Sequence, residues 1–263
     1  MLFKTDKITG VVIKGMNILK NWKIYFYLIF TYVIMQIGSI FLVKPIFQYF
    51  KGNPSLTTQQ AEYHGIAWSL FTANTLAAII FLLLTFTRKN FFHVFKGKPA
   101  SVGSTILWGV LGFFLALFGQ MAAAFIEQLI GVEAGSENTA FLSEIAKVAP
   151  IIIICFVIFA PLLEEIIFRR VIFGGLYQKT NFIIAALISG LIFAAVHGEL
   201  QHTLIYLAPG LVFSFVYYKT KRLITPMISH LLMNGLVVTI QLNYEKLEQL
   251  QNMHKSFITF LLG

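Results

Sequence analysis

Six polar side chains in otherwise apolar stretches are candidates for catalytic chemistry. They comprise two adjacent carboxylates, an arginine, two histidines and an asparagine, namely Glu164, Glu165, Arg169, His197, His230 and Asn234. A carboxylate that stays free can act as a general base on a water, and imidazole and amide N–H groups can donate to a developing oxyanion. The spacing of these residues indicates which of them can act together.

Helix geometry divides the carboxylate pair into two roles. Two carboxylates side by side in a low-dielectric site do not both ionise easily. Glu165 and Arg169 are four residues apart and share a helix face, so they can form an ion pair. Glu164 points about 100° away on the same helix, which leaves it free for chemistry. The alternative is a helix end at the membrane interface with ordinary snorkelling charges.

The same geometry brings His197 towards Glu164. The apolar pattern predicts that the helix carrying Glu164 continues to about residue 178 and turns near Lys179. Glu164 lies about 15 residues before this turn and His197 about 18 after it, so an antiparallel helix pair places both at nearly the same depth. A lone histidine is, alternatively, a packing or hydrogen-bonding residue.

His230 and Asn234 are four residues apart and present one polar patch on an apolar helix. The patch is a candidate functional site or, alternatively, forms hydrogen bonds between helices. His230 lies about 12 Å from Arg222 along the helix. It reaches the depth of Glu164 if the turn near Lys179 protrudes into the cytosol.

The composition predicts that membrane helices position these residues. The 263 residues are 57% hydrophobic and 12% charged, against roughly a quarter charged in a soluble domain. This excludes a soluble cytosolic enzyme and a disordered chain. Seven runs can cross a bilayer: Trp22–Val43, Tyr63–Phe86, Thr105–Ile130, Ala146–Phe168, Phe182–His197, Thr203–Tyr218 and Ile224–Leu242. We expect an all-α, polytopic membrane helix bundle of about seven (seven to eight) transmembrane helices.

The basic residues predict the orientation of this bundle. Most of the 20 Lys and Arg residues lie before the first run or after the second, fourth and sixth. The basic side faces the cytoplasm, so the N-terminus is predicted inside and the C-terminus outside, in a bacterial plasma membrane. The net charge of +9 therefore indicates anionic lipid and not a nucleic-acid partner.

The predicted spans and the polar candidates divide the chain into four parts. Residues 1–21 form an amphipathic segment on the inner surface or a solvated lead-in, and residues 22–145 hold helices without a motif. Residues 146–242 hold all six candidates, and residues 243–263 form a tail whose apolar patch, Phe257–Leu262, is too short to span. The single cysteine, Cys155, cannot form an intramolecular disulfide.

In this order the motifs resemble those of a known family. Glu164-Glu165-x-x-x-Arg169, Phe193-x-x-x-His197 and His230-x-x-x-Asn234 are similar to signature motifs of the CAAX protease and bacteriocin-processing family, also called Abi. The family includes the type II CAAX prenyl endopeptidases, and the resemblance covers about residues 146–242. It implies an intramembrane endopeptidase with Glu164 as general base and His197 as holder of the water. It further implies that His230 and Asn234 donate to the oxyanion, while Glu165 and Arg169 orient the catalytic carboxylate.

A zinc mechanism is the alternative, because two histidines and a glutamate can ligate zinc and family members are often labelled metalloproteases. No His-Glu-x-x-His motif occurs and Asn234 is a poor zinc ligand, so the sequence favours chemistry without a cofactor. The expected partners are the lipid bilayer and a peptide or membrane-protein substrate reached from the cytosolic side. Rival functions are a non-catalytic bacteriocin self-immunity or regulatory protein and a transporter with buried carboxylates.

Overall fold

The computed structural model describes residues 5–86, 88, 90–133, 135–244 and 246–249, with side chains from residue 22 onwards. In this part of the chain the regular elements are all helical, which confirms the predicted fold class. They are α1 (Thr5–Lys51), α2 (Thr58–Phe86), α3 (Val102–Leu129), α4 (Glu137–Val148), α5 (Ile151–Ile154), η1 (Cys155–Phe159), α6 (Ala160–Glu164), η2 (Glu165–Phe173), α7 (Gly174–Tyr177), α8 (Phe182–Ala195), η3 (Leu200–His202), α9 (Thr203–Thr220) and α10 (Ile224–Leu242). The predicted patch Phe257–Leu262 lies outside the described residues.

Six helical stretches are long and apolar enough to cross a membrane: Trp22–Lys51, Thr58–Phe86, Val102–Leu129, Ile151–Tyr177, Leu200–Thr220 and Ile224–Leu242. The remaining predicted crossing is α8, whose 14 residues pack against η2 and α9. Large apolar side chains are exposed on the outside, including Phe41 at 75% and Leu83 at 64%. Such a surface is suited to lipid, as expected for a multi-pass membrane protein.

The predicted start of the fourth crossing at Ala146 is wrong, because the crossing helix begins at Ile151. Ala146 belongs to α4, a 12-residue helix that the apolar pattern did not predict. A proline keeps the preceding residue out of the helical conformation, and Ala149, before Pro150, has φ −127° and ψ 78°. From Ile151 the helix runs to Tyr177, which confirms the predicted continuation to about residue 178.

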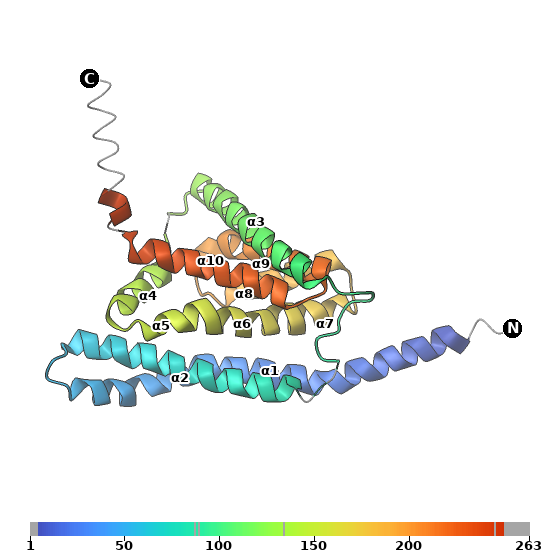
Figure 1. Ribbon diagram of the computed structural model, residues 1–263, viewed down its shortest axis with the longest axis horizontal. Helices are drawn as coiled ribbons and strands as arrows, with labels where there is room; N and C mark the ends of the chain where they lie inside the picture. Colours follow the sequence, from blue (N-terminus) through green and yellow to red (C-terminus); the bar gives the residue numbers. More distant parts are fainter. Residues whose placement is uncertain (1–4, 87, 89, 134, 245, 250–263) are drawn as a thin grey trace, which may run out of the picture.

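Two groups of helices flank the rod Ile151–Tyr177. The α1–α2 pair lies on one side of it, and α3, α8, α9 and α10 lie on the other (Figure 1). One end of the bundle holds α4, the α1–α2 connection and the end of α10, and is called the α4 end below. The opposite end holds Arg88, residues 90–101 and the turns at 178–181 and 221–223. It carries Arg88, Lys96, Lys98, Lys179, Lys221 and Arg222 and is called the basic end.

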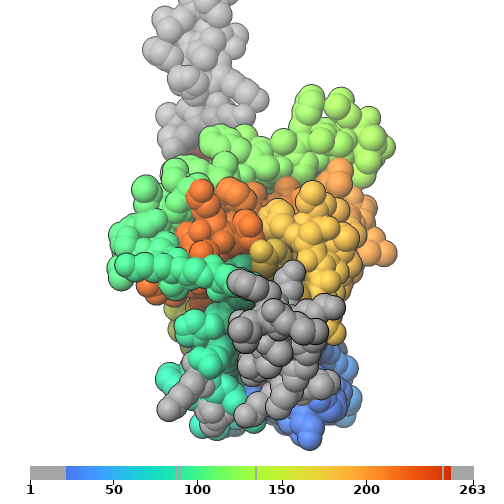
Figure 2. Space-filling view, turned by 90° about the vertical axis from the view of Figure 1, so that its right-hand side faces the viewer, coloured from blue at the N-terminus to red at the C-terminus, as the bar shows by residue number. Residues whose placement is uncertain are grey.

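Side chains tie the connections of the basic end to the helices. Arg222 Nε donates a hydrogen bond to Ala100 O at 2.5 Å. Arg170 from η2 donates to Phe91 O and, at 2.8 Å, to the Tyr25 hydroxyl of α1. Figure 2 looks onto this end and shows the segment before α3 lying beside the start of α10. The connections therefore pack onto the bundle at this end.

Glycine allows α3 and α10 to approach closely. A Cβ on Gly112 would lie 2.4 Å from Ser229 Oγ, and this hydroxyl donates to Gly109 O at 2.7 Å. Small residues and interhelical hydrogen bonds of this kind hold membrane helices together. The contact holds α10 at Ser229, the residue directly before His230 in the chain.

Two π-helical segments, η1 and η2, flank Glu164 in the rod. Such wide turns occur frequently at functional sites. Here side chains of neighbouring helices bind their carbonyls: Asn234 Nδ2 donates to Phe156 O at 2.8 Å, and Ser189 Oγ donates to Phe168 O at 2.7 Å. The rod is thereby attached to α10 and α8 on either side of Glu164.

Candidate active site

The four residues predicted to touch substrate or water line one cavity of about 540 Å³. Glu164 ends α6, His197 follows α8, and His230 and Asn234 lie on α10. The side chains of Glu164 and His230 are 14% and 6% exposed. The fold thus brings together residues from three separate helical segments in a site largely removed from solvent.

Glu165 lies behind the cavity wall and contacts two residues. Its Oε1 accepts from His230 Nδ1 at 2.9 Å, and its Oε2 lies 3.1 Å from Arg169 Nε. The predicted ion pair between Glu165 and Arg169 is therefore present. The buried guanidinium of Arg169 also lies 4.6 Å from the ring centroid of Phe193 and 5.3 Å from that of Phe213. These aromatic faces favour a cation at this position.

The contact with Glu165 fixes the orientation of His230. A carboxylate accepts hydrogen bonds, so Nδ1 of the histidine donates to Glu165 and Nε2 faces Glu164. Nε2 lies 3.8 Å from Glu164 Oε2, longer than a direct hydrogen bond and within the span of a bridging water. The ring stacks on Phe213 with centroids 4.9 Å apart.

His197 is held by its own helix and by a stacked ring. Its Nδ1 donates to Phe193 O at 2.7 Å, and its ring stacks on Tyr206 with centroids 4.0 Å apart. A carbonyl only accepts, so Nδ1 carries the proton and Nε2 is the acceptor in the neutral ring. His197 lines the same cavity as Glu164. The imidazole nitrogen that lies 3.8 Å from Glu164 Oε2 is, however, Nε2 of His230 and not a nitrogen of His197.

Asn234 contributes an oriented amide to the cavity wall. Its Nδ2 donates to Phe156 O, which leaves the second N–H and the amide oxygen for other partners. A carboxylate, two imidazoles and an amide N–H around one cavity can together hold a water, take its proton and bind an oxyanion.

Comparisons with known proteins agree with this arrangement. Residues 146–236 match a family model described as type II CAAX prenyl endopeptidase Rce1-like. The putative membrane peptidase YdiL of Bacillus subtilis is 39% identical over 84% of this chain and 90% of its own length. The chain belongs to the Rce1-like CAAX protease family. The membrane-embedded CAAX protease MroQ of Staphylococcus aureus is 36% identical over 81% of this chain and 87% of its own length.

A shorter match joins this CAAX protease family member to the UPF0177 protein YvdC of Lactococcus lactis, 30% identical over 51% of this chain and 52% of its own length. No solved structure matches the chain. The 221 residues shared with YdiL exceed the region matched by the family model. The shared stretch therefore includes part of the N-terminal helices.

Glu164, His197 and His230 of this CAAX protease family member line the cavity and are the residues there that could ligate a metal ion. Among the residues with described side chains, no group of three His, Cys, Asp or Glu is placed to hold one. The Nδ1 atoms of His197 and His230 are bound to Phe193 O and Glu165, so each ring offers one nitrogen to the cavity.

Arg170, which has no role in the sequence motifs, is buried and connects η2 to α1 and to the segment before α3. Its side chain is 1% exposed and its guanidinium lies 4.4 Å from the Phe91 ring centroid and 5.3 Å from that of Tyr25. Together with its hydrogen bonds to the same two residues, this attaches η2 to α1 and to the basic end. The one sequence signal for this role is a second arginine within an apolar run.

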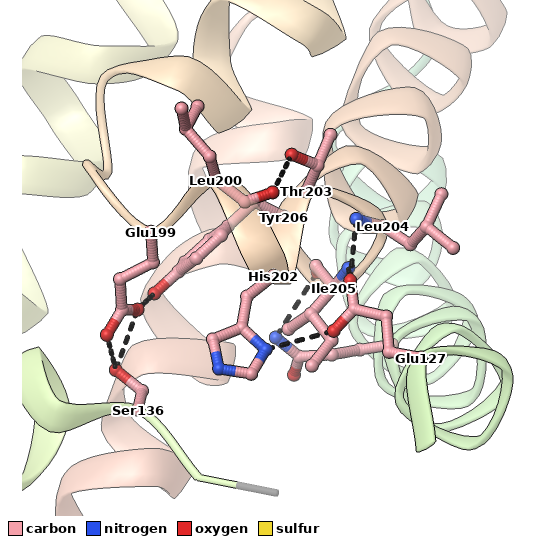
Figure 3. A network of polar contacts seen from close by, with 10 residues as sticks. Glu127, Ser136, Glu199, Leu200, His202, Thr203, Leu204, Ile205 and Tyr206 are labelled. Atoms are coloured by element: carbon pink, nitrogen blue, oxygen red, sulfur yellow. Dashed lines mark hydrogen bonds and ion pairs between the residues drawn. The ribbon is translucent and has the colours of Figure 1, made fainter. Parts of the chain in front are cut away.

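A polar network outside the motifs includes Tyr206, the residue whose ring stacks on His197, and Figure 3 shows this network. Tyr206, which stacks on His197, donates to Glu199 Oε2 at 2.5 Å, and the hydroxyl of Ser136 lies 3.0 and 2.9 Å from the two oxygens of Glu199. Burial acts to raise the pKa of Glu199, but hydrogen bonds from Tyr206, Ser136 and the Asn138 N–H outweigh it and lower the pKa. The network joins the start of α4 to the α8–α9 connection.

Glu127 of α3 caps the start of α9 in the same region (Figure 3). One carboxylate oxygen accepts from the N–H groups of Leu204 and Ile205 at 2.8 and 3.2 Å, and the other lies 3.0 Å from His202 Nδ1. α9 has no side-chain cap of its own, so this carboxylate satisfies its first amides and complements the helix dipole.

Proposed function

We propose that this chain is an intramembrane endopeptidase in which Glu164 activates the attacking water. The observation that carries the proposal is the pair of Glu164 Oε2 and His230 Nε2, which lie 3.8 Å apart on one cavity. Glu165 holds the histidine from behind at 2.9 Å. Family membership supports peptidase chemistry in general, and the roles of the individual residues are part of the proposal.

In the proposed reaction a water is held by Glu164 and Nε2 of His197. Glu164 takes a proton from the water while the water oxygen bonds to the scissile carbonyl carbon, and the carbonyl π electrons move to oxygen. An Nε2–H of His230 and the second N–H of Asn234 donate to this oxyanion. Glu164 then gives its proton to the amine as the C–N bond breaks, which yields an acid and an amine.

Glu165 and Arg169 act through their neighbours. The carboxylate of Glu165 stabilises the positive ring of His230, and Arg169 neutralises Glu165 from the other side at 3.1 Å. All three side chains are buried. The donors are therefore oriented before the substrate binds, as electrostatic catalysis requires.

The test compares membranes from cells that produce the wild type, Glu164→Gln and His197→Ala. N-terminal peptide mass spectrometry is expected to detect cleavage products with the wild type and a loss of roughly 100-fold or more with both variants. The exposed Glu62→Gln on α2 is the matched control and is expected to retain wild-type processing.

Equal processing by Glu164→Gln and the wild type would overturn the catalytic proposal and favour a self-immunity or regulatory role. Metal analysis of the purified protein tests the cofactor-free mechanism. Stoichiometric zinc whose removal abolishes cleavage would overturn that mechanism.

A further inference from the structure

The cavity extends from the motif residues to the α4 end of the bundle. Its inner wall holds Glu164 and His230, and its outer wall holds Ser136, Asn138 and Thr139 at the start of α4 together with Gln241 and Leu242 at the end of α10. Figure 1 places both of these segments at the same end of the molecule. Asn138 and Leu242 are exposed, so the cavity reaches the surface beside α4.

Towards the basic end the site is closed. Glu165 and Arg169 are 0% exposed and Phe168 is 1% exposed directly behind the cavity wall. Beyond them the rings of Phe95, Phe173, Tyr177, Tyr217, Tyr218 and Phe182 pack with centroids 4.9 to 6.3 Å apart. No described residue of the 88–101 segment or of the turns at 178–181 and 221–223 lines the cavity.

The distribution of charge then gives the side of the membrane. The closed end carries the Lys and Arg residues of three connections, and basic connections face the cytoplasm. The α4 end bears Lys51 and Lys147 together with the acidic Glu133, Glu137 and Glu144. The open end of the cavity accordingly lies on the extracytoplasmic side, opposite to the side from which the sequence analysis expected the substrate.

The cavity wall also limits the chemistry of what enters. Apart from Glu164, His197 and His230, the lining residues carry no ionisable acid or base other than Cys155, Tyr32 and Tyr206. Uncharged amides and hydroxyls are distributed along it, on Gln36, Asn74, Gln120, Ser143 and Asn234. Such groups can bind a peptide backbone, whereas a charged side chain would be desolvated without a partner of opposite sign.

Resting on the proposed function, we propose that the cavity admits an extended peptide segment with uncharged side chains from the extracytoplasmic side. Asn138 at the opening and Ser143 on the lining of α4 are then accessible from outside the cell. Lys98 and Lys179, both exposed at the basic end, are accessible from inside.

Cysteine labelling tests the direction of access without requiring cleavage. In a Cys155→Ala background, Asn138→Cys, Ser143→Cys, Lys98→Cys and Lys179→Cys are each treated with a membrane-impermeant maleimide in intact and in permeabilised cells. The two α4 positions are expected to label at least tenfold faster than the two basic-end positions in intact cells, and all four to label after permeabilisation. Labelling of Lys98→Cys and Lys179→Cys but not of the α4 positions in intact cells would overturn the proposal.

Peptide protection tests the substrate class. Ser143→Cys is combined with Glu164→Gln, so that a bound peptide is not cut, and intact cells are incubated with a Ser/Ala/Leu peptide or a Lys/Asp-substituted peptide of equal length. The uncharged peptide is expected to slow labelling several-fold and the charged one to leave it unchanged. Equal protection by the two peptides would overturn the proposed preference for uncharged side chains. Failure of cleavage in the wild type with the labelling pattern intact would refute the proposed function alone.

Discussion

Removing the charge of Glu165 tests how the buried cluster behind the cavity is stabilised. Glu165→Gln preserves the side-chain shape and leaves Arg169, 0% exposed, without the carboxylate that lies 3.1 Å from its Nε. Breaking one side of a buried ion pair costs about 3–5 kcal/mol, because the remaining charge is buried without compensation. At roughly 2–4 °C per kcal/mol, the unfolding midpoint is expected to fall by about 10 °C.

The chain contains its own probe for this measurement. Cys155 is the single cysteine and is 2% exposed, so a thiol-reactive fluorophore labels it when the bundle opens during heating in detergent micelles. Glu144→Gln is the matched control, since it removes one carboxylate from a pair whose members are 42% and 56% exposed. An exposed pair of this kind contributes less than about 1 kcal/mol.

A double variant separates charge from packing. Glu165→Gln with Arg169→Met removes both charges, and neutral replacement of a buried pair is often close to neutral in stability. The double variant is therefore expected to recover much of the midpoint lost by Glu165→Gln. The reasoning is refuted if Glu165→Gln and Glu144→Gln shift the midpoint equally, or if the double variant is no more stable than Glu165→Gln.

Two further variants test contacts outside the motifs. Tyr206→Phe keeps the ring that stacks on His197 and loses the hydrogen bond to Glu199, a charged hydrogen bond of about 1.5–3 kcal/mol. The rate of peptide cleavage is expected to fall in Tyr206→Phe and to fall further in Tyr206→Leu, which also loses the ring. An unchanged rate in both variants would exclude a positioning role for Tyr206. Gly112→Ala places a Cβ 2.4 Å from Ser229 Oγ and is expected to cost about 1–3 kcal/mol in the same thermal assay. Its control is Gly119→Ala on the same helix, where the nearest atom would be 3.6 Å away, and equal midpoints for the two variants would contradict the close approach.

Local spacing was sufficient to predict the parts of the site that depend on one helix. The ion pair of Glu165 with Arg169 follows from a separation of four residues. The expectation that Glu164 and His197 share a depth comes from counting residues on either side of the turn near Lys179; it stays a prediction, and the two residues line one cavity. Both predictions use only the pitch of a helix, which the sequence determines locally.

Contacts between distant segments were not predictable in this way. The bond of Ser136 to Glu199 joins residues 63 apart, and that of Arg170 to Tyr25 joins residues 145 apart. No periodic pattern in the sequence indicates which of these distant residues will be in contact. The break before Pro150 was within reach of the sequence, because a proline restricts its predecessor, but the apolar residues on both sides of it resembled one continuous run.

The wall of the cavity is built from two parts of the chain, of which only the second carries the sequence motifs. The family model begins at residue 146, yet Tyr32 and Gln36 of α1 and Asn74 of α2 also line the cavity. Substitutions on α1 and α2 can therefore change the shape and polarity of the cavity without changing Glu164, His197, His230 or Asn234.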